Sequence, residues 1–147
     1  MDNYKICSMT YALIPVDNKE TLVIEKNKEL VIKKSLKKII DFNCMIYGSS
    51  YEGRLSSSKL LLNLNNNLPI MIEESKKIII LPTSSTRNKK CCWILFNNII
   101  DYYKIANTTI VIFKNNKKLV FDITISNFEK QIFKINKLLL KINSKKL

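Results

Sequence analysis

Hydrophobic and polar residues in the first third of the chain follow the pattern of short strands. Polar runs separate three segments rich in β-branched and other apolar residues, which are residues 8–16, 21–25 and 30–33. This pattern predicts an N-terminal meander of three strands. The next segment, residues 35–42, places Leu36, Ile39 and Ile40 at the i, i+3, i+4 spacing of a short helix.

The middle of the chain predicts a helix followed by a hairpin. Ser49 and Glu52 have the spacing of a capping box, so we expect a helix to begin there and to end near Leu62. A polar run rich in asparagine then interrupts the pattern. The apolar residues 69–72 and 77–82 predict two strands joined by a tight turn.

The pattern beyond residue 90 predicts three more strands. Residues 91–103 form a long apolar run in which Asn97 and Asn98 indicate either a break or a bulge. Residues 108–114 and 118–125 alternate between apolar and polar positions around a polar turn, which is typical of a hairpin.

The chain ends with the pattern of an amphipathic helix. Ser126 and Glu129 repeat the capping-box spacing. Apolar residues follow at helical spacing, namely Phe128, Ile132, Ile135, Leu139 and Ile142. Lysines follow on what we expect to be the opposite face, namely Lys130, Lys134, Lys137 and Lys141. The order of elements predicts one domain over residues 1–147, of the α+β class, in which a C-terminal amphipathic helix and shorter helices accompany an antiparallel β-sheet.

The charge of the chain indicates an anionic partner. Its 147 residues include 25 Lys and Arg against 12 Asp and Glu, a formal net charge of +13. Such an excess favours nucleic acid or an acidic membrane surface as the partner. Lys, Asn and Ile are abundant, as in the products of AT-rich genomes, so codon usage explains part of the lysine content. It does not explain the shortage of acids.

Composition also excludes several kinds of site. The chain has no histidine, which rules out Ser-His-Asp and Cys-His catalysis and removes the commonest metal ligand. Its four cysteines form no C-x-x-C pair, so we expect reduced thiols, no metal site and no cofactor. Residues 1–9 lack the apolar core of a signal peptide and no apolar run reaches the length of a membrane span, so we expect a cytoplasmic protein.

Two hydroxyl-rich loops are the best candidates for anion binding. Residues 48–54 contain both glycines of the chain, which indicates one demanding backbone site, and residues 83–90 form the second loop. Each loop holds one of the two arginines. Backbone N–H groups at a helix start, hydroxyl donors and a planar guanidinium suit a phosphate or a narrow groove of negative potential. The candidate residues are Ser49, Ser50, Arg54, Ser84, Ser85, Thr86, Arg87, Lys89 and Lys90.

Each candidate also has an ordinary structural explanation. Ser49 is a plausible N-cap, residues 83–86 suit a simple turn, and Arg54 is able to pair with Glu52 or with a carboxylate of the sheet. Lysines opposite an apolar helix face are typical of any solvated surface. Like charges at i, i+4 nevertheless oppose helix formation, and an anionic partner would relieve that repulsion. We therefore expect the four lysines to contact phosphates without reading sequence.

Four segments of the chain combine into a more specific pattern. They are CMIYGSSYEGR at 44–54, PIMI at 69–72, LPTSSTR at 81–87 continuing through Cys92 to Ile94, and ISNFEKQ at 125–131. In order and spacing they resemble the ComK family of competence transcription factors, over roughly residues 11–142. The resemblance implies a DNA-binding activator that recognises paired A-tract and T-tract boxes, contacts the minor groove, bends the DNA and turns on genes for DNA uptake.

The resemblance also implies partners. We expect double-stranded AT-rich DNA, further copies of the chain on the same promoter, and RNA polymerase. The best-known family member continues beyond the final helix into a tail that is tied to activation and to capture by a proteolytic adaptor. This chain ends at Leu147, which argues against an adaptor as a partner.

Two other classes of function remain open from the residues alone. A small basic β module with a C-terminal helix would also suit anionic membrane or phosphoinositide head groups, although we expect no membrane partner. An enzyme with a Ser or Cys nucleophile would need Lys or carboxylate bases, and no adjacent pair of such residues stands out. We therefore expect no enzymatic activity.

Overall fold

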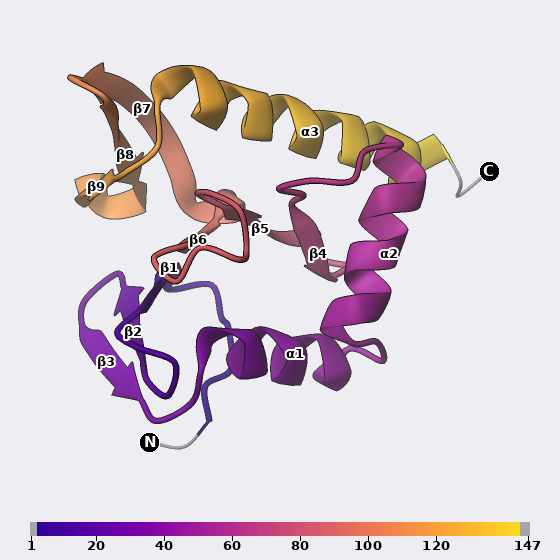
Figure 1. Ribbon diagram of the computed structural model, residues 1–147, viewed down its shortest axis with the longest axis horizontal. Helices are drawn as coiled ribbons and strands as arrows, with labels where there is room; N and C mark the ends of the chain where they lie inside the picture. The colour runs from indigo at the N-terminus through magenta and orange to yellow at the C-terminus, as the bar shows by residue number, and fades with distance from the viewer. Residues whose placement is uncertain (1–2, 145–147) are drawn as a thin grey trace.

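The computed structural model describes residues 3–144, in which three α-helices and nine strands follow one another (Figure 1). The first half contains β1 (Thr10–Pro15), β2 (Thr21–Glu25), β3 (Glu29–Ile32), α1 (Leu36–Ile46) and α2 (Tyr51–Leu62). The second half contains β4 (Ile70–Glu73), β5 (Ile78–Pro82), β6 (Trp93–Leu95), β7 (Ile99–Ile105), β8 (Thr108–Phe113), β9 (Lys118–Phe121) and α3 (Ile125–Ser144). The α+β class, the antiparallel pairing of strands and the C-terminal helix are as predicted, but the strands form two sheets in place of the predicted single sheet.

Six strands form a sheet in the order β3-β2-β1-β6-β5-β4, with every neighbouring pair antiparallel. The predicted N-terminal meander and the predicted hairpin of β4 and β5 are both confirmed. The short strand β6 joins these two units, because its Trp93 lies opposite Leu13 of β1 and Pro82 of β5.

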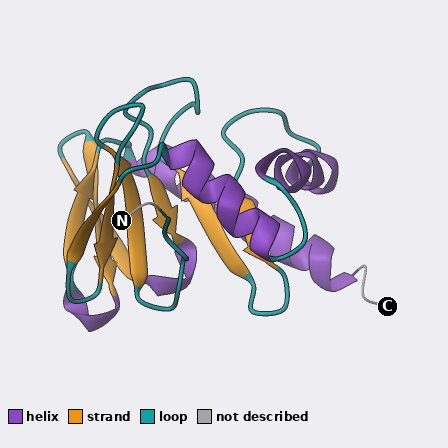
Figure 2. Cartoon of the chain, turned by 90° about the horizontal axis from the view of Figure 1, so that it is seen from below, coloured by secondary structure: helices purple, strands orange, loops and turns teal. Residues whose placement is uncertain are grey.

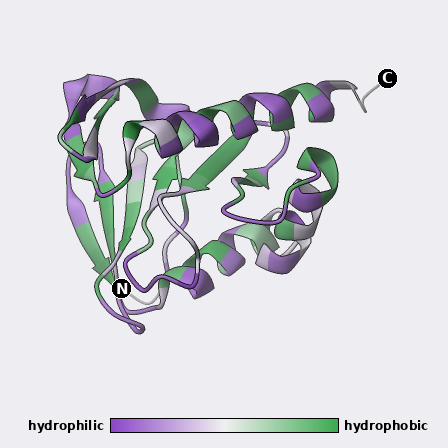
Figure 3. Cartoon of the chain, turned by 45° about the horizontal axis from the view of Figure 1, so that its top comes forward, coloured by the Kyte–Doolittle hydropathy of each residue, from purple (hydrophilic) through white to green (hydrophobic). Residues whose placement is uncertain are grey.

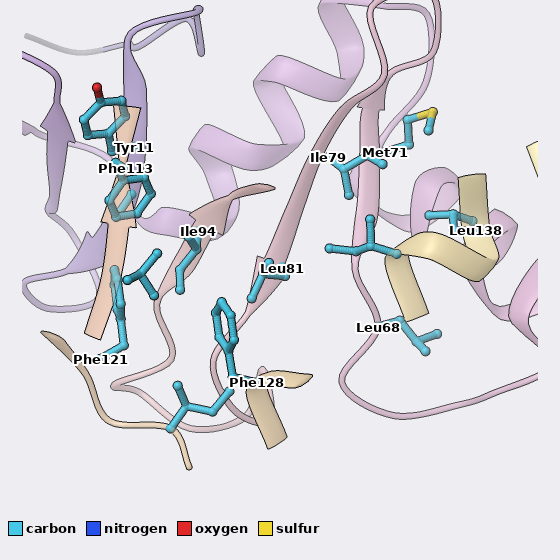
Figure 4. Packing of buried hydrophobic residues seen from close by; sticks show 14 of the residues in the cluster. Tyr11, Leu68, Met71, Ile79, Leu81, Ile94, Phe113, Phe121, Phe128 and Leu138 are labelled. Carbon is cyan, nitrogen blue, oxygen red and sulfur yellow. The ribbon is translucent and has the colours of Figure 1, made fainter. Parts of the chain in front are cut away.

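Both faces of this sheet are buried, since successive side chains of a strand point to opposite sides. In β6, Ile94 packs in a cluster with α3 and the later strands, whereas Trp93 and Leu95 pack in a second cluster with α1. Figure 4 shows Ile94, Leu81 and Phe128 of the first cluster. The double burial explains why these strands appear in the sequence as nearly continuous apolar runs.

The remaining strands form a second sheet in the order β7-β8-β9. The chain passes between the two sheets at a short 3-10 turn, Phe96–Asn98, so the sequence break predicted there is confirmed. The buried Asn98 amide donates to the carbonyl oxygens of Ser8 at 3.0 Å and Thr10 at 2.6 Å. These bonds attach the crossing backbone to the N-terminal part of the first sheet.

Gly48 separates α1 from α2 and has a positive φ of 82°. The N–H of Ser49 donates to the carbonyl of Cys44 and the N–H of Gly48 to that of Met45, each at 3.0 Å, which is the Schellman arrangement. A Cβ added at Gly48 would meet no atom within 4 Å. The backbone conformation, and not crowding, therefore requires glycine here.

The start of α2 differs by one residue from the predicted start. Ser50, not Ser49, is the N-cap, because its Oγ accepts the N–H of Gly53 at 2.9 Å. Glu52 does not complete a capping box and instead lies 3.9 Å from Lys37 Nζ. Neighbouring serines are equally good caps in sequence, and the Schellman turn before them decides which one reaches the helix.

The start of α3 also differs from prediction. Thr124 caps this helix through its Oγ1, which accepts the N–H of Asn127 at 3.2 Å, so Ser126 lies inside the first turn. The Glu129 carboxylate accepts a hydrogen bond from the Tyr102 hydroxyl at 3.0 Å in place of a capping interaction. This contact connects the first turns of α3 to β7.

The first helix, α1, continues past the predicted end at Phe42 to Ile46. Asn43, a weak helix former, is fully buried within it. Its amide donates to the carbonyl of Tyr4 at 2.9 Å and accepts the N–H of Ile6 at 2.8 Å. The N-terminal segment supplies these partners, and a local sequence pattern does not reveal them.

Helix α3 packs along one side of the molecule, and α2 lies at the end opposite to β7, β8 and β9 (Figures 1 and 2). The buried residues of α3 are Phe128, Gln131, Ile135, Leu138 and Ile142. This confirms three residues of the predicted apolar face, whereas the predicted Ile132 and Leu139 are only partly buried against the first cluster. Hydrophobic and hydrophilic residues alternate along the helix (Figure 3). Phe133 and Leu140 remain on the exposed face.

Candidate nucleic-acid interface

The loop between β5 and β6, residues Thr83–Lys90, carries most of the candidate residues, and we call it the basic loop. Hydrogen bonds between Thr83 and Cys92 close the base of this loop where it leaves the sheet. The N–H of Thr83 donates to the carbonyl of Cys92 at 2.9 Å, and the N–H of Cys92 donates to Thr83 Oγ1 at 3.0 Å. Thr83 is therefore a buried structural residue at the base of the loop.

Inside the basic loop, short polar side chains shape the backbone. Ser85 Oγ accepts the N–H of Arg87 at 3.3 Å, and Ser84 Oγ donates to the Ser85 carbonyl at 3.4 Å. The Asn88 side chain accepts the N–H of Lys90 at 2.9 Å. These bonds use Ser and Asn groups for turn formation, as expected of such residues in loops.

The cationic side chains of the basic loop are exposed. Arg87, Lys89 and Lys90 all lie at the surface, as do Ser85 and Thr86. Within residues 3–144, the Arg87 guanidinium makes no hydrogen bond or ion pair. The hydrogen bond that Arg87 does make comes from its backbone N–H. Arg87 is therefore charged, exposed and able to contact an anionic partner.

One side of the basic loop forms a wall of a groove of about 1040 Å³, which we call the first groove. The other walls are the turn between β1 and β2 and the N-terminal ends of α1 and α2. Its basic residues are Lys37, Arg87, Lys89 and Lys90. Burial and the charge of Glu52 raise the pKa of Tyr51, and a side-chain hydrogen bond with Thr86 opposes that rise. Tyr51 of α2 and Thr86 of the basic loop both line this groove.

The other side of the basic loop borders a groove of about 650 Å³, the second groove. Ser84 and Ser85 line it from the loop, Lys130 and Lys134 line it from α3, and Asn107 lines it from the turn between β7 and β8. The first residues of the basic loop (83–85) therefore line the second groove and its later residues (86–90) line the first, and each groove contains basic side chains.

The structure does not bring Arg54 to the basic loop. Arg54 lines a small cavity with Glu74 of the turn after β4 and with Leu138 of α3, and this cavity shares no residue with the first groove. Its Nη2 donates to the Tyr47 carbonyl at 3.5 Å, while its buried Nε has no hydrogen-bond partner among the described residues. This environment favours the structural explanation for Arg54.

The two serines beside Arg54 also have structural contacts. Ser50 is the cap of α2, and the backbone N–H of Ser49 completes the Schellman turn. A Cβ added at Gly53 would lie 2.7 Å from Ser49 Oγ and 3.2 Å from Ser50 Oγ. The close approach at Gly53 is therefore made by these two hydroxyl groups.

The lysine stripe of α3 divides into two pairs. Lys134 Nζ donates to the carbonyls of Asn66 and Asn67, at 3.3 and 3.1 Å, and Lys137 Nζ donates to that of Leu62 at 3.4 Å. Burial, with the nearby charge of Lys130, lowers the pKa of Lys134. Lys134 and Lys137 are thus half-buried and attach α3 to the last residue of α2 and to the segment after it, whereas Lys130 and Lys141 are exposed.

One basic residue of the first groove, Lys37, is not marked by any local sequence pattern. Lys37 lies in the first turn of α1, 3.9 Å from Glu52 and 5.7 Å from the centre of the Tyr51 ring. Its position beside the basic loop depends on the packing of α1 against α2, which no local pattern specifies.

Two of the thiols, those of Cys44 and Cys92, are not activated. Burial raises the pKa of Cys44 and of Cys92 to about 11, so both are protonated and weakly nucleophilic at neutral pH. Cys91 and Cys92 pack on opposite sides of the first sheet, as expected of neighbours in an extended segment. In residues 3–144, no three Cys, Asp or Glu side chains gather as a metal site, and none of the helices there could cross a membrane.

Comparison with known proteins gives one family and one curated relative. The family model described as "ComK protein" matches residues 1–146. A "Competence transcription factor" of Bacillus subtilis (strain 168) is 27% identical over 138 residues, which cover 91% of this chain and 72% of the relative. No solved structure matches the chain significantly.

Proposed function

The chain belongs to the ComK family, and from this premise we propose that it is a DNA-binding transcriptional activator of competence genes that recognises AT-rich duplex through the minor groove. The name of the Bacillus subtilis relative, a competence transcription factor, supports the regulatory role. ComK proteins are transcription factors and not enzymes, which agrees with a chain that has no histidine and whose Cys44 and Cys92 thiols are protonated.

The observation that carries the proposal is the exposed Arg87 on a loop whose residues line two basic grooves. A minor groove is a channel about 6 Å wide between two phosphate strands. A loop that borders two basic grooves has the complementary shape. Narrow minor grooves of A-tracts carry enhanced negative potential and attract arginine in particular.

The side chains of the grooves suit the flanking phosphates. In the first groove these are Lys37, Lys89 and Lys90, and in the second they are Ser84 and Lys130. Lysine and hydroxyl contacts to phosphates hold a protein on the duplex but carry no sequence information directly. Discrimination is therefore assigned to Arg87, and affinity to the residues of the two grooves.

Several parts of the proposal rest on the family and on composition. Residues 1–147 act as one DNA-binding domain in the cytoplasm, more than one copy binds a promoter, and RNA polymerase is the partner in activation. Arg54 supports the fold beside Glu74 and is not required to touch DNA.

A titration against three ligands tests this function. We expect gel shifts with an AT-tract duplex, weaker binding to a GC-rich duplex of equal length, and a strong decrease in affinity between two salt concentrations, because phosphate contacts release counterions. Vesicles with anionic head groups should bind only weakly. Equal affinity for both duplexes would refute AT recognition, and tighter binding to vesicles than to DNA would favour a membrane-binding module.

A further inference from the structure

The second groove brings polar side chains together from several parts of the chain. They include Ser84, Asn107, Asp122, Asn127, Lys130 and Lys134. Among the described residues, no aromatic side chain lines this groove. Its volume of about 650 Å³ lies within the usual range for small-molecule sites, about 300 to 1,000 Å³. The groove therefore has room for a small ligand and is lined mainly by polar groups.

Four of these polar side chains have no partner in the protein. Within residues 3–144, the side chains of Asn107, Asp122, Asn127 and Lys130 make no hydrogen bond or ion pair. Asp122 and Lys130 do not pair with each other, although both line the same groove. All four side chains are exposed and therefore able to contact a ligand.

A buried residue of the same groove, Gln131, also lacks a partner. Gln131 is only 4% exposed, and its Nε2 donates to the carbonyl oxygen of Asn67 at 2.7 Å. Its Oε1 is buried and has no hydrogen-bond partner among the described residues. An unpaired buried acceptor costs free energy, so most such groups in folded proteins are paired. A ligand hydroxyl bound at this wall would supply the missing donor.

The two lysines of the groove favour an anion. Burial, and to a smaller extent the charge of Lys130, lowers the pKa of Lys134, so the two ammonium groups repel each other. Lys134 Nζ already donates to two backbone carbonyls, whereas Lys130 is exposed and unpaired. A phosphate bound between them would relieve this repulsion and would accept charge-assisted hydrogen bonds.

The other side chains limit what the phosphate is attached to. A groove without an aromatic ring offers no stacking surface for a nucleobase. A polar lining also disfavours an acyl chain, whose binding depends on apolar contacts. Amides donate and accept hydrogen bonds and a carboxylate accepts them, so Asn107, Asn127 and Asp122 suit hydroxyl groups. These requirements together describe a phosphorylated sugar.

We propose that the second groove is a binding site for a free sugar phosphate. Lys130, Lys134 and the Ser84 hydroxyl hold the phosphate, and the amides and the carboxylate of the groove bind the sugar hydroxyls. Under the proposed function, Ser84 and Lys130 also contact phosphates of the duplex, whose backbone has the same chemistry. The sugar phosphate therefore competes with DNA. This competition rests on the proposed function, whereas binding of the free sugar phosphate does not.

NMR titrations of the free protein with glucose 6-phosphate, glucose and inorganic phosphate, at constant ionic strength, test the site. Glucose 6-phosphate should shift the amide signals of residues that line the second groove. It should bind about tenfold more tightly than phosphate, the effect of one or two additional hydrogen bonds, and glucose should bind most weakly. Equal affinity for glucose 6-phosphate and phosphate would show a general anion site, and shifts confined to the first groove would place the ligand elsewhere. Either result would overturn the inference.

Substitution of lysines tests the phosphate end of the site. Lys130→Gln should weaken binding of both glucose 6-phosphate and phosphate by about tenfold, since a charged hydrogen bond is lost. Lys104→Gln is the matched control, because Lys104 is exposed on β7 and lines neither groove. It should leave both affinities unchanged. Equal effects of the two substitutions would show attraction by net charge alone and would overturn the inference.

Two further substitutions test the sugar end of the site. Asp122→Ala should bind phosphate at least as tightly as the wild type, because a repelling charge is removed, and should lose most of the preference for glucose 6-phosphate. Asn127→Ala should also reduce this preference, and alanine is a strong helix former, so this variant covers the case in which Asp122→Ala does not fold. Thermal melts establish folding. Full preference in both folded variants would overturn the inference.

Gel shifts with an AT-tract duplex distinguish the free sugar phosphate from the DNA backbone as occupants of the groove. Glucose 6-phosphate should weaken duplex binding more than sulfate does at equal ionic strength. If it binds the groove but leaves duplex binding unchanged, the DNA contacts assigned to Ser84 and Lys130 are wrong, while the sugar phosphate site is supported. If the wild type binds no duplex, the proposed function fails, and the NMR titrations still decide whether the sugar phosphate site exists.

Discussion

Among single residues, the two arginines have similar sequence surroundings and different environments. Both follow hydroxyl-rich segments, and from sequence both are candidates for DNA contact. Arg87 is exposed on the basic loop, whereas the guanidinium of Arg54 lies beside Glu74 and Leu138 with its Nε buried. The sequence identifies the two segments but not which arginine is exposed, because Glu74 and Leu138 come to lie beside the half-buried Arg54 of α2 only in the folded chain.

Substitution of each arginine by lysine separates these roles. Lysine keeps the charge but is more strongly hydrated and lacks the planar fork, so it enters a narrow groove less readily. Arg87→Lys should retain non-specific binding and lose about 1 to 3 kcal/mol of preference for A-tract over mixed duplex. Competition gel shifts measure this preference.

Arg54→Lys is the matched control. It should keep the preference and lower the melting temperature, because lysine cannot reproduce the guanidinium contacts inside the cavity. An unchanged preference in Arg87→Lys, or a lost preference in Arg54→Lys with an unchanged melt, would contradict the assignment.

Gly48 permits a second prediction at this scale. Gly48→Ala should reduce the free energy of unfolding by about 1 kcal/mol, since a residue with a Cβ is strained at its φ of 82°. Asn63 also has a positive φ, of 54°, so Asn63→Gly should relieve strain and leave stability equal or higher. Denaturant melts compare the two, and equal effects of both substitutions would refute the strain argument.

At the scale of elements, α3 shows how far periodicity can predict a site. The apolar spacing predicted the helix and its buried face, and the lysine spacing predicted a single cationic stripe. Lys134 and Lys137 instead donate to carbonyls of Asn66, Asn67 and Leu62. These partners lie at the last residue of α2 and in the irregular segment after it. Tertiary packing sets the path of that segment, and the pattern of α3 contains no signal for it.

The two lysine pairs should therefore respond differently to substitution by glutamine. Lys130→Gln/Lys141→Gln should flatten the log-log salt dependence of DNA binding by up to about 2, since each phosphate contact contributes about 0.9. Lys134→Gln/Lys137→Gln should lower the melting temperature, because carbonyl groups lose their donors. Salt titrations of DNA binding and thermal melts of both double variants test this prediction. Equal changes of salt slope and of melting temperature in the two variants would contradict the division of the lysines into two pairs.

The hairpin of β4 and β5 should make stability depend on pH. Burial raises the pKa of Glu73, but hydrogen bonds from Ser75 and from the N–H of Lys76 outweigh that effect, so the pKa lies below its usual value. The folded state therefore favours the carboxylate. Its contribution is present above the unfolded pKa of about 4.3 and is lost as pH falls through the lower folded value.

Glu73→Gln tests this dependence. The variant should be less stable than the wild type at pH 7, and the difference should shrink as pH falls below about 4.3. Urea melts at several pH values measure it. A difference that stays constant across this range would show that the Glu73 charge makes no contribution.

For the whole molecule, strand and helix positions could be predicted because each strand or helix has its own periodicity. The pairing of β1 with β6 and the division into two sheets could not, since they join segments far apart in sequence. The same holds for the site. The basic loop was recognisable from its Ser, Thr and Arg content, whereas its two flanking grooves depend on α1, α2 and α3 being packed around it.

The central claim, recognition of AT-rich duplex through the minor groove, is tested most directly by blocking one groove at a time. We would measure gel-shift affinity for an AT-tract duplex with a minor-groove-binding drug and, separately, with a methyl mark in the major groove. The account predicts that the drug displaces the wild type and that the methyl mark has little effect. Loss of binding on the methylated duplex, with the drug unable to compete, would contradict it.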